Sequence, residues 1–142
     1  MIDKTLSERE QIREAGLKVT HPRMRILRLL EESEQIHLSA EEVYRILIET
    51  NEEIGLATVY RVLTQFEQSG ILKRHNFETG HSVFELDRGE HHDHLLCIKC
   101  GAVEEFHDEQ IESLQYKVSE AHNFKTIDHS LTIYGHCKSC QV

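Results

Sequence analysis

The sequence has no hydrophobic run long enough to cross a membrane, because its apolar stretches are only a few residues long. Its first residues, MIDKTLSEREQIREAG, also have no apolar core of the kind that a secretory signal requires. These absences predict a cytoplasmic protein without membrane contact, in a compartment where thiols stay reduced. Internal repeats and low-complexity segments are absent too, so the 142 residues fit one ordinary domain or two small ones.

Net positive charge is also lacking. The chain has 16 Lys and Arg against 25 Asp and Glu, which gives a formal net charge of -9. This balance argues against a protein that binds nucleic acid with its whole surface. Residues 18–30 are an exception, because this segment has four basic residues and no acidic one. The segment predicts either a local phosphate contact or a solvated helix face, and charge alone does not separate the two.

The first half has the pattern of three helices. Thr20 and Pro22 predict the start of the first, and a capping box at residues 39–42 predicts the start of the second. Residues 56–69 carry apolar side chains at i, i+3, i+4 and i+7, which predicts a third helix with one face in the core. Gly70 then predicts its end.

Two strand-like segments, residues 71–77 and 81–87, flank the turn ETG and predict a β-hairpin. Three helices followed by a hairpin is the order of a winged helix-turn-helix, whose last helix enters the major groove of DNA. The same order occurs in folds that never bind DNA, so the order leaves that point open.

The second half predicts a small α+β unit with one amphipathic helix. The expected strands cover residues 91–98, 103–107 and 124–137, and the expected helix covers residues 108–122. The periodicity of that helix predicts three inward-facing side chains: Ile111, Leu114 and Val118.

The four cysteines form two C-x-x-C pairs, Cys97 with Cys100 and Cys137 with Cys140. Zn²⁺ prefers tetrahedral thiolate ligands, and each pair supplies two of them from one tight turn. A thioredoxin-type redox pair is the alternative, but neither pair has the strand-to-helix context that it needs. Because protein ligands would fill all four positions, the predicted zinc site is structural rather than catalytic.

The segment HHDH, residues 91–94, predicts metal binding on two faces of one strand. Side chains alternate along a strand, so His91 and Asp93 would point one way and His92 and His94 the other. Each pair needs further ligands, and the candidates are Glu85, Glu104 or Glu105, Glu112, His37 and His129. Imidazole and carboxylate ligands suit Fe²⁺, Mn²⁺, Co²⁺, Ni²⁺ or Zn²⁺ without choosing among them. A chance cluster of solvated histidines is the alternative.

Two other functions fit parts of this pattern less well. A metallohydrolase would need an open coordination position and a nearby general base, and HHDH lacks the spacing of zinc-hydrolase motifs. A metal-buffering protein without DNA function would not need the basic residues of segment 18–30.

Six segments together closely resemble the ferric uptake regulator family, from about residue 15 to residue 140: AGLKVTHPR, HLSAEEVY, EIGLATVYRVLTQFEQSGI, HSVFEL, HHDHLLCIKCG and HSLTIYGHC. GLATVYRVL and HHDHLxCxxCG are highly specific among them. The resemblance implies an α+β chain with a winged helix-turn-helix DNA-binding domain (1–84), a hinge (85–90) and a small α/β dimerisation and metal-binding domain (91–142).

The resemblance also implies a role for particular residues. The regulatory metal ligands correspond to His37, Glu85, His92, His94 and Glu105. A second metal site corresponds to His91, Asp93, Glu112 and His129. The structural zinc ligands correspond to Cys97, Cys100, Cys137 and Cys140. The DNA-binding candidates are Lys18, Arg23, Thr58, Tyr60 and Arg61.

The function that the resemblance implies is a metal-dependent transcriptional regulator, not an enzyme. Such a protein binds AT-rich inverted repeats of double-stranded DNA as a homodimer and represses iron-uptake genes when Fe²⁺ is bound. Mn²⁺, Co²⁺ or Zn²⁺ can replace Fe²⁺, Zn²⁺ fills the structural site, and no small-molecule substrate is expected. Whether two dimers form a tetramer, and what the second site does, stay open.

A zinc, manganese or peroxide sensor on the same scaffold is the alternative function. Peroxide-sensing relatives carry an aspartate where this chain has Glu105, which favours iron sensing over peroxide sensing. Many members also carry a third histidine where this chain has Glu90, and the chain has no histidine-rich tail after Cys140. Neither of these departures touches a proposed ligand.

Overall fold

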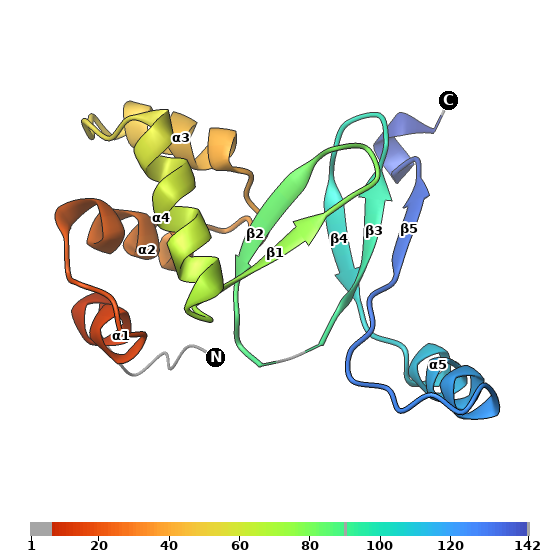
Figure 1. Cartoon of the computed structure of the whole chain (residues 1–142). Coiled ribbons are helices and arrows are strands. Elements are labelled where there is room, and N and C mark those ends of the chain that lie inside the picture. The colour runs from red at the N-terminus through yellow and green to blue at the C-terminus, as the bar shows by residue number, and fades with distance from the viewer. Residues whose placement is uncertain (1–6, 90, 142) are drawn as a thin grey trace. The chain divides into compact units, whose positions relative to one another are not determined.

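The computed structural model describes residues 7–89 and 91–141. The chain divides into two compact units, unit 1 (Met1–Glu90) and unit 2 (His91–Val142), which Figure 1 shows in red to green and in green to blue. Glu90, the last residue of the predicted hinge, lies outside the described residues. Within the described ranges, every helix is too short or too polar to span a bilayer.

Unit 1 begins with four helices: α1 (Glu8–Glu14), α2 (His21–Glu32), α3 (Ala40–Glu49) and α4 (Leu56–Gln68). The sequence predicted the last three but not α1. The predicted caps are present, because Thr20 accepts a hydrogen bond from the backbone of Arg23, and Ser39 and Glu42 form a reciprocal capping box. Gly70 follows α4 with a φ of 87°, a left-handed conformation that glycine adopts without strain.

One hydrophobic core holds unit 1 together. The predicted core stripe of α4 is buried: Val59, Val62, Leu63 and Phe66. It packs with buried residues of α2 and α3 and with Phe84 of the hairpin. The opposite face of α4 is thereby left at the surface, and this face carries Tyr60 and Arg61.

The hairpin of unit 1 consists of β1 (Leu72–Asn76) and β2 (Ser82–Leu86), which pair antiparallel with Lys73 opposite Glu85. A further bridge between Leu38 and Phe84 ties β2 to the segment before α3, so His37 lies beside the hairpin. Glu85 is thus a strand residue, held in a fixed register with β1, although the predicted hinge starts at this position.

Unit 2 has a three-stranded sheet with the order β4-β3-β5, in which β3 (Asp93–Cys97) pairs antiparallel with β4 (Val103–Phe106) and parallel with β5 (Thr132–Gly135). Helix α5 (Glu109–Ala121) connects β4 to β5, and a short 3-10 helix, η1 (Lys138–Cys140), ends the unit. The strands are shorter than predicted, because residues 91–92 and 124–131 lie outside them. The predicted α+β class is confirmed.

The prediction that α5 turns Leu114 and Val118 inward is wrong for this chain. Each of the two side chains is 60% exposed, and α5 has no buried residue among those described. An amphipathic pattern shows that a helix has an apolar face, but it does not show which chain covers that face.

Candidate metal centres and nucleic-acid interface

The two C-x-x-C pairs come together in unit 2. Cys97 ends β3, and Cys137 is the N-cap of η1, so the parallel pairing of β3 with β5 brings the two turns side by side. The four sulfur atoms lie within 4.8 Å of one another, and Cys100 Sγ is 3.8 Å from Cys137 Sγ. All four cysteines are free thiols, as a tetrahedral zinc site requires.

The electrostatics of this cluster fit a bound cation. The pKa of Cys97 is lowered to about 5, mainly by hydrogen bonds from backbone N–H groups of Cys137, Cys100 and Lys99 and by the thiol of Cys100. Desolvation of Cys97 opposes this shift and raises its pKa. The hydrogen bond with Cys137, desolvation and the other thiols raise the pKa of Cys140 to about 12. The protein therefore stabilises the thiolate of Cys97 by itself, and a divalent cation would supply the positive charge that a thiolate at Cys140 needs.

The second cluster contains all four residues expected for a second metal site. His91 Nε2 is 3.2 Å from Asp93 Oδ1 and from Glu112 Oε1, and it is 3.1 Å from His129 Nε2. His129 Nε2 is in turn 2.8 Å from Glu112 Oε2. Helix α5 supplies Glu112, and the segment before β5 supplies His129.

Asp93 shows that this cluster fits a cation. The residue is fully buried, and its Oδ2 has no hydrogen-bond partner among the described residues. A buried carboxylate is costly unless it is paired or bound to a metal, so these residues match an imidazole-carboxylate metal site.

A third cluster lies within unit 1 and contains one residue that the sequence did not predict. His37 Nε2 is 3.4 Å from Glu85 Oε2, and His75 Nε2 is 2.6 Å from Glu85 Oε1. Their ligand atoms lie within 4.8 Å of one another. Two histidines and one carboxylate form a set that suits Fe²⁺ and related metals.

The register of the hairpin explains why His75 joins this cluster. Lys73 is opposite Glu85, and His75, two residues further on, points to the same face of the hairpin as Lys73. A reading of the sequence that extended the hairpin register from the ETG turn would have placed His75 diagonally across from Glu85.

The remaining predicted regulatory ligands lie in unit 2. His92 Nε2 is 3.7 Å from Glu105 Oε2, and His94 is directly opposite Glu105 in the pairing of β3 with β4. His91 instead contacts Asp93 and Glu112, so the two predicted sets have different carboxylate neighbours.

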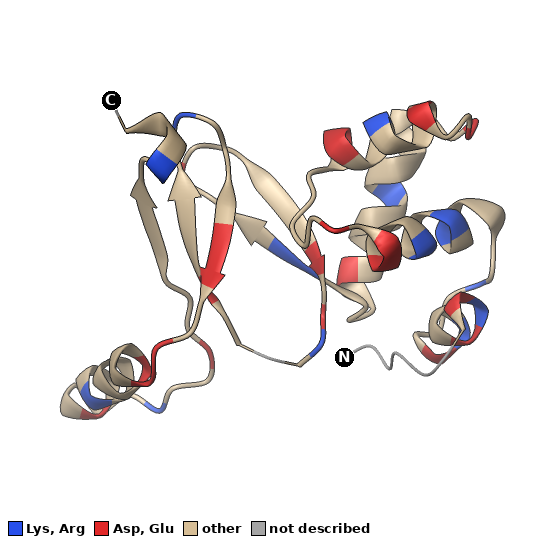
Figure 2. Cartoon of the chain, turned by 180° about the vertical axis from the view of Figure 1, so that it is seen from behind, with Lys and Arg blue, Asp and Glu red and all other residues tan. Residues whose placement is uncertain are grey.

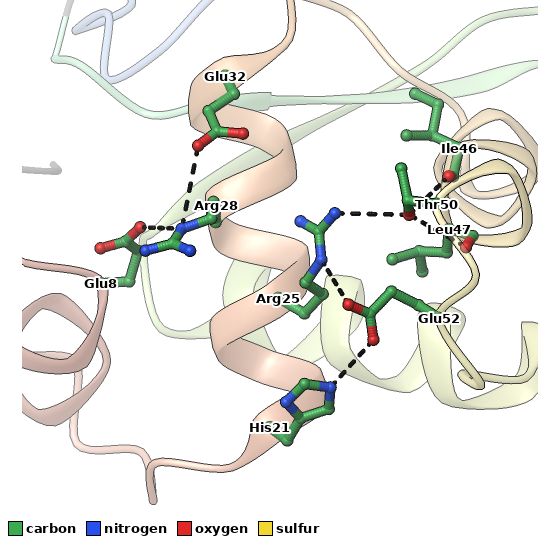
Figure 3. Close-up of polar contacts among 9 residues, drawn as sticks. All are labelled: Glu8, His21, Arg25, Arg28, Glu32, Ile46, Leu47, Thr50 and Glu52. Carbon is green, nitrogen blue, oxygen red and sulfur yellow. Dashed lines mark hydrogen bonds and ion pairs between the residues drawn. The ribbon is translucent and has the colours of Figure 1, made fainter.

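The basic segment 18–30 is partly neutralised by its own unit. Arg25 Nε donates to Glu52 at 2.9 Å, and Arg28 Nε lies 3.0 Å from Glu8 and 3.9 Å from Glu32 (Figure 3). Figure 2 accordingly shows basic and acidic positions interspersed over the helices of unit 1. Two of the four basic residues therefore face carboxylates, and Lys18 and Arg23 are better candidates for DNA binding.

The predicted contacts of α4 lie on its surface side. Tyr60 is 42% exposed and Arg61 is exposed, whereas Thr58 is half-buried in the first turn. The hydroxyl of Tyr60 donates to the carboxylate of Glu41 at the start of α3, a partner that the sequence did not suggest. An exposed Arg and Tyr pair on one helix face can reach base edges and phosphates in a major groove.

Comparison with known proteins decides the family. Residues 14–134 match the model of the ferric uptake regulator family. The ferric uptake regulation protein of Legionella pneumophila is 60% identical over 136 residues, which cover 96% of this chain and 100% of the relative. This chain belongs to the ferric uptake regulator family.

Solved structures of the family have the same fold. The Vibrio cholerae ferric uptake regulator matches with a TM-score of 0.85 and 53% identity over 91% of this chain and 98% of that one. The Francisella tularensis regulator, solved with iron, matches with a TM-score of 0.84 and 46% identity over 88% of this chain and 95% of that one. The fold is therefore that of the family along almost the whole chain.

Membership in the ferric uptake regulator family identifies the chain as a metal-dependent DNA-binding transcriptional regulator. It is not an enzyme, so the alternative of a metallohydrolase is excluded. The cluster of four cysteines has the composition of a structural zinc site, and two further clusters can hold a metal.

The contact of Tyr60 with Glu41 predicts that the stability of the folded chain depends on pH. The hydrogen bond raises the pKa of Tyr60 above its ordinary 10.0 and lowers the pKa of Glu41 below its ordinary 4.5. The contribution of Glu41 to stability is full above pH 4.5 and is lost as the pH falls through its folded pKa. The contribution of Tyr60 is full below pH 10.0 and is lost as the pH rises through its folded pKa.

Glu41→Gln is therefore expected to move one of the four tyrosines to a lower pKa, nearer 10.0, in an ultraviolet titration of tyrosinate. Glu49→Gln is the control, because Glu49 is exposed at the other end of α3. Coinciding titration curves for Glu41→Gln and the wild-type chain would show that this contact does not form in solution.

Proposed function

We propose that this chain is an Fe²⁺-responsive repressor of iron-uptake genes, which acts in the cytoplasm as a homodimer on AT-rich inverted repeats. Residues 1–84 are the DNA-binding domain, residues 85–90 the hinge and residues 91–142 the dimerisation domain. The observation that carries the proposal is the cluster of His37, His75 and Glu85 within the winged-helix unit. Metal ligands in that unit give DNA binding a direct dependence on metal.

The regulatory site takes ligands from both units: His37 and Glu85 from unit 1, and His92, His94 and Glu105 from unit 2. Fe²⁺ held by these residues would act as a Lewis acid shared by the two sets of ligands. His37 and His75 hold Glu85 from two sides, and Glu105 lies beside both His92 and His94, so each set is arranged before the metal arrives. Arranged ligands bind more tightly because less conformational freedom is lost.

The linked units account for the switch. In a two-fold dimer, the separation of the two α4 helices must match half-sites about one helical turn apart. Without the link, only a fraction of dimers has that separation, and the apparent DNA affinity falls by the same fraction. A metal at 100 times its dissociation constant shifts this equilibrium by about 2.7 kcal/mol, roughly a hundredfold.

Exposed apolar side chains of unit 2 support the homodimer. Leu114 and Val118 of α5 are joined by Leu95 and Ile133 on the sheet, all of which are exposed in the single chain. Large apolar side chains gathered on a small unit are typical of a surface that a second subunit covers.

The residues proposed to serve DNA binding, by direct contact or by support, are Lys18, Arg23, Thr58, Tyr60 and Arg61. Lys18 is exposed in the loop before α2, where it can enter a minor groove. Tyr60 and Arg61 are exposed on α4, whose first turn has no acidic side chain, so its N-terminus attracts phosphate. Arg61 can read guanine or hold a phosphate, and an AT-rich target favours the phosphate.

The test is fluorescence anisotropy with a duplex that carries an AT-rich inverted repeat. The wild-type chain is titrated under anaerobic conditions with Fe²⁺ and with a chelator, and again with a scrambled duplex. We expect Fe²⁺ to tighten binding to the repeat about a hundredfold over the chelated protein. Equally tight binding after confirmed chelation would exclude an iron-dependent repressor, and activation by Mn²⁺ or Zn²⁺ alone at defined free concentration would identify a sensor for those metals.

His75→Ala is expected to weaken regulatory metal binding at least tenfold, because Glu85 loses the partner that orients it. Competition of Co²⁺ with a chromophoric chelator measures the affinity, and the Co²⁺ absorption spectrum reports any change of ligands. His81→Ala is the control, since His81 lies on the same hairpin and stacks on Phe77, with 6.3 Å between the ring centroids. An unchanged Co²⁺ affinity and spectrum would show that His75 has no part in the site.

A further inference from the structure

Arg23 connects the loop before α2 to the DNA-facing helix α4. Its Nη1 donates to the main-chain oxygen of Lys18 at 2.6 Å. Its Nε and Nη2 both donate to Oε1 of Gln65, at 3.3 Å and 2.8 Å. All three guanidinium nitrogens thus contact protein oxygens, and one side chain joins residues that are far apart in the sequence.

The chemistry of these contacts suits a fixed support. A guanidinium is planar and presents its N–H donors in a rigid fork. The Lys18 carbonyl and the Gln65 side chain are therefore held at a fixed distance from each other. Arg25 and Arg28, which lie on the same helix as Arg23, form ion pairs with carboxylates. Both acceptors of Arg23, in contrast, are neutral oxygens. The contacts of Arg23 therefore fix a backbone position without cancelling the positive charge beside it.

The two ends of this connection lie next to DNA-binding candidates. Residues 17–20 have no regular secondary structure, so hydrogen bonds between backbone groups of a helix or strand do not hold the carbonyl of Lys18 in place. Gln65 lies one helical turn beyond Arg61, on the same face of α4. The loop that carries Lys18 is thus attached to the face that carries Arg61.

We propose that Arg23 is a positioning residue that holds Lys18 at a fixed distance from the recognition face of α4, rather than a direct phosphate contact. The proposal rests on the proposed DNA-binding function. A lysine for the minor groove and an arginine for the major groove must match one duplex together, and a support fixed before binding reduces the entropy lost on binding.

Salt dependence of DNA binding separates positioning from direct contact, because each phosphate contact contributes about 0.9 to the slope of log K against log salt. The metal-loaded full chain is titrated with the AT-rich repeat at several salt concentrations. We expect Gln65→Ala and Arg23→Gln to weaken binding about five- to tenfold each and to leave the slope unchanged. The double variant is expected to be no weaker than Arg23→Gln, since both changes break one connection.

Two further variants complete the test. Arg23→Lys keeps the charge but not the fork, so we expect it to bind DNA as poorly as Arg23→Gln. Gln68→Ala, an identical change at an exposed position of α4, should bind as the wild-type chain does. Three results together would overturn the proposal in favour of a phosphate contact. Gln65→Ala would bind DNA with full affinity, Arg23→Lys would bind as tightly as the wild-type chain, and Arg23→Gln would lower the slope of log K against log salt by about one.

A measurement without DNA keeps this test independent of the proposed function. Amide hydrogen exchange at residues 17–20 should speed up in Gln65→Ala and Arg23→Gln but not in Gln68→Ala, while the melting temperature stays close to that of the wild-type chain. Unchanged exchange in this loop would overturn the positioning role. If exchange changes but the wild-type chain shows no metal-dependent DNA binding, the connection stands and the DNA-binding function fails.

Discussion

Glu85→Ala and His92→Ala are each expected to abolish the gain in DNA affinity that Fe²⁺ produces, a loss of about a hundredfold at saturating metal. Glu85 accepts contacts from both His37 and His75, so its removal leaves unit 1 without the carboxylate of its metal cluster. His92 contacts Glu105 and belongs to the proposed ligands of unit 2. Because the proposed switch requires ligands from both units, either change alone should be sufficient.

Anisotropy with and without Fe²⁺ measures both variants, and DNA binding by the chelated protein should stay as it is in the wild-type chain. His21→Ala is the control, because His21 is exposed on unit 1 and contacts the carboxylate of Glu52, which is not a proposed metal ligand. A full Fe²⁺ response in His92→Ala, with the Glu85→Ala response lost, would place the switch in unit 1 alone and remove the link between units from the mechanism.

Cys137→Ser is expected to abolish zinc binding at the four-cysteine cluster and to unfold unit 2. Among the described residues of this unit, Leu96 and Cys97 are the only buried hydrophobic side chains. A unit with so small a core needs a metal or a partner subunit, and structural zinc contributes about 10–16 kcal/mol in small zinc domains. Unit 1, with its own large core, should stay folded.

Zinc content and thermal unfolding followed by circular dichroism measure this effect, with size-exclusion chromatography to follow the loss of the proposed dimer. His136→Ala is the control, because this exposed histidine precedes Cys137 and lies outside the cluster. A Cys137→Ser chain that has lost its zinc but keeps the unit 2 secondary structure and the full wild-type unfolding signal would show that zinc does not stabilise unit 2.

The sequence by itself determined the features that depend on local spacing. The apolar stripe of α4 was predicted and is buried, because helical periodicity alone selects one face. The capping boundaries of α2 and α3 follow from hydrogen bonds that span three residues. Strand alternation predicted the division of HHDH into two sets, although only Asp93 and His94 lie in β3, and the spacing of the two C-x-x-C pairs predicted a shared metal.

Only the tertiary structure decided which distant side chains meet. His75 joins Glu85 through the register of the hairpin, and Arg23 joins Lys18 to Gln65 across helices that are far apart in the sequence. Arg25 and Arg28 contact the carboxylates of Glu52, in the loop after α3, and of Glu8 in α1. Local patterns set by helical or strand geometry repeat over a few residues, whereas each of these contacts depends on the path of the backbone through the whole unit.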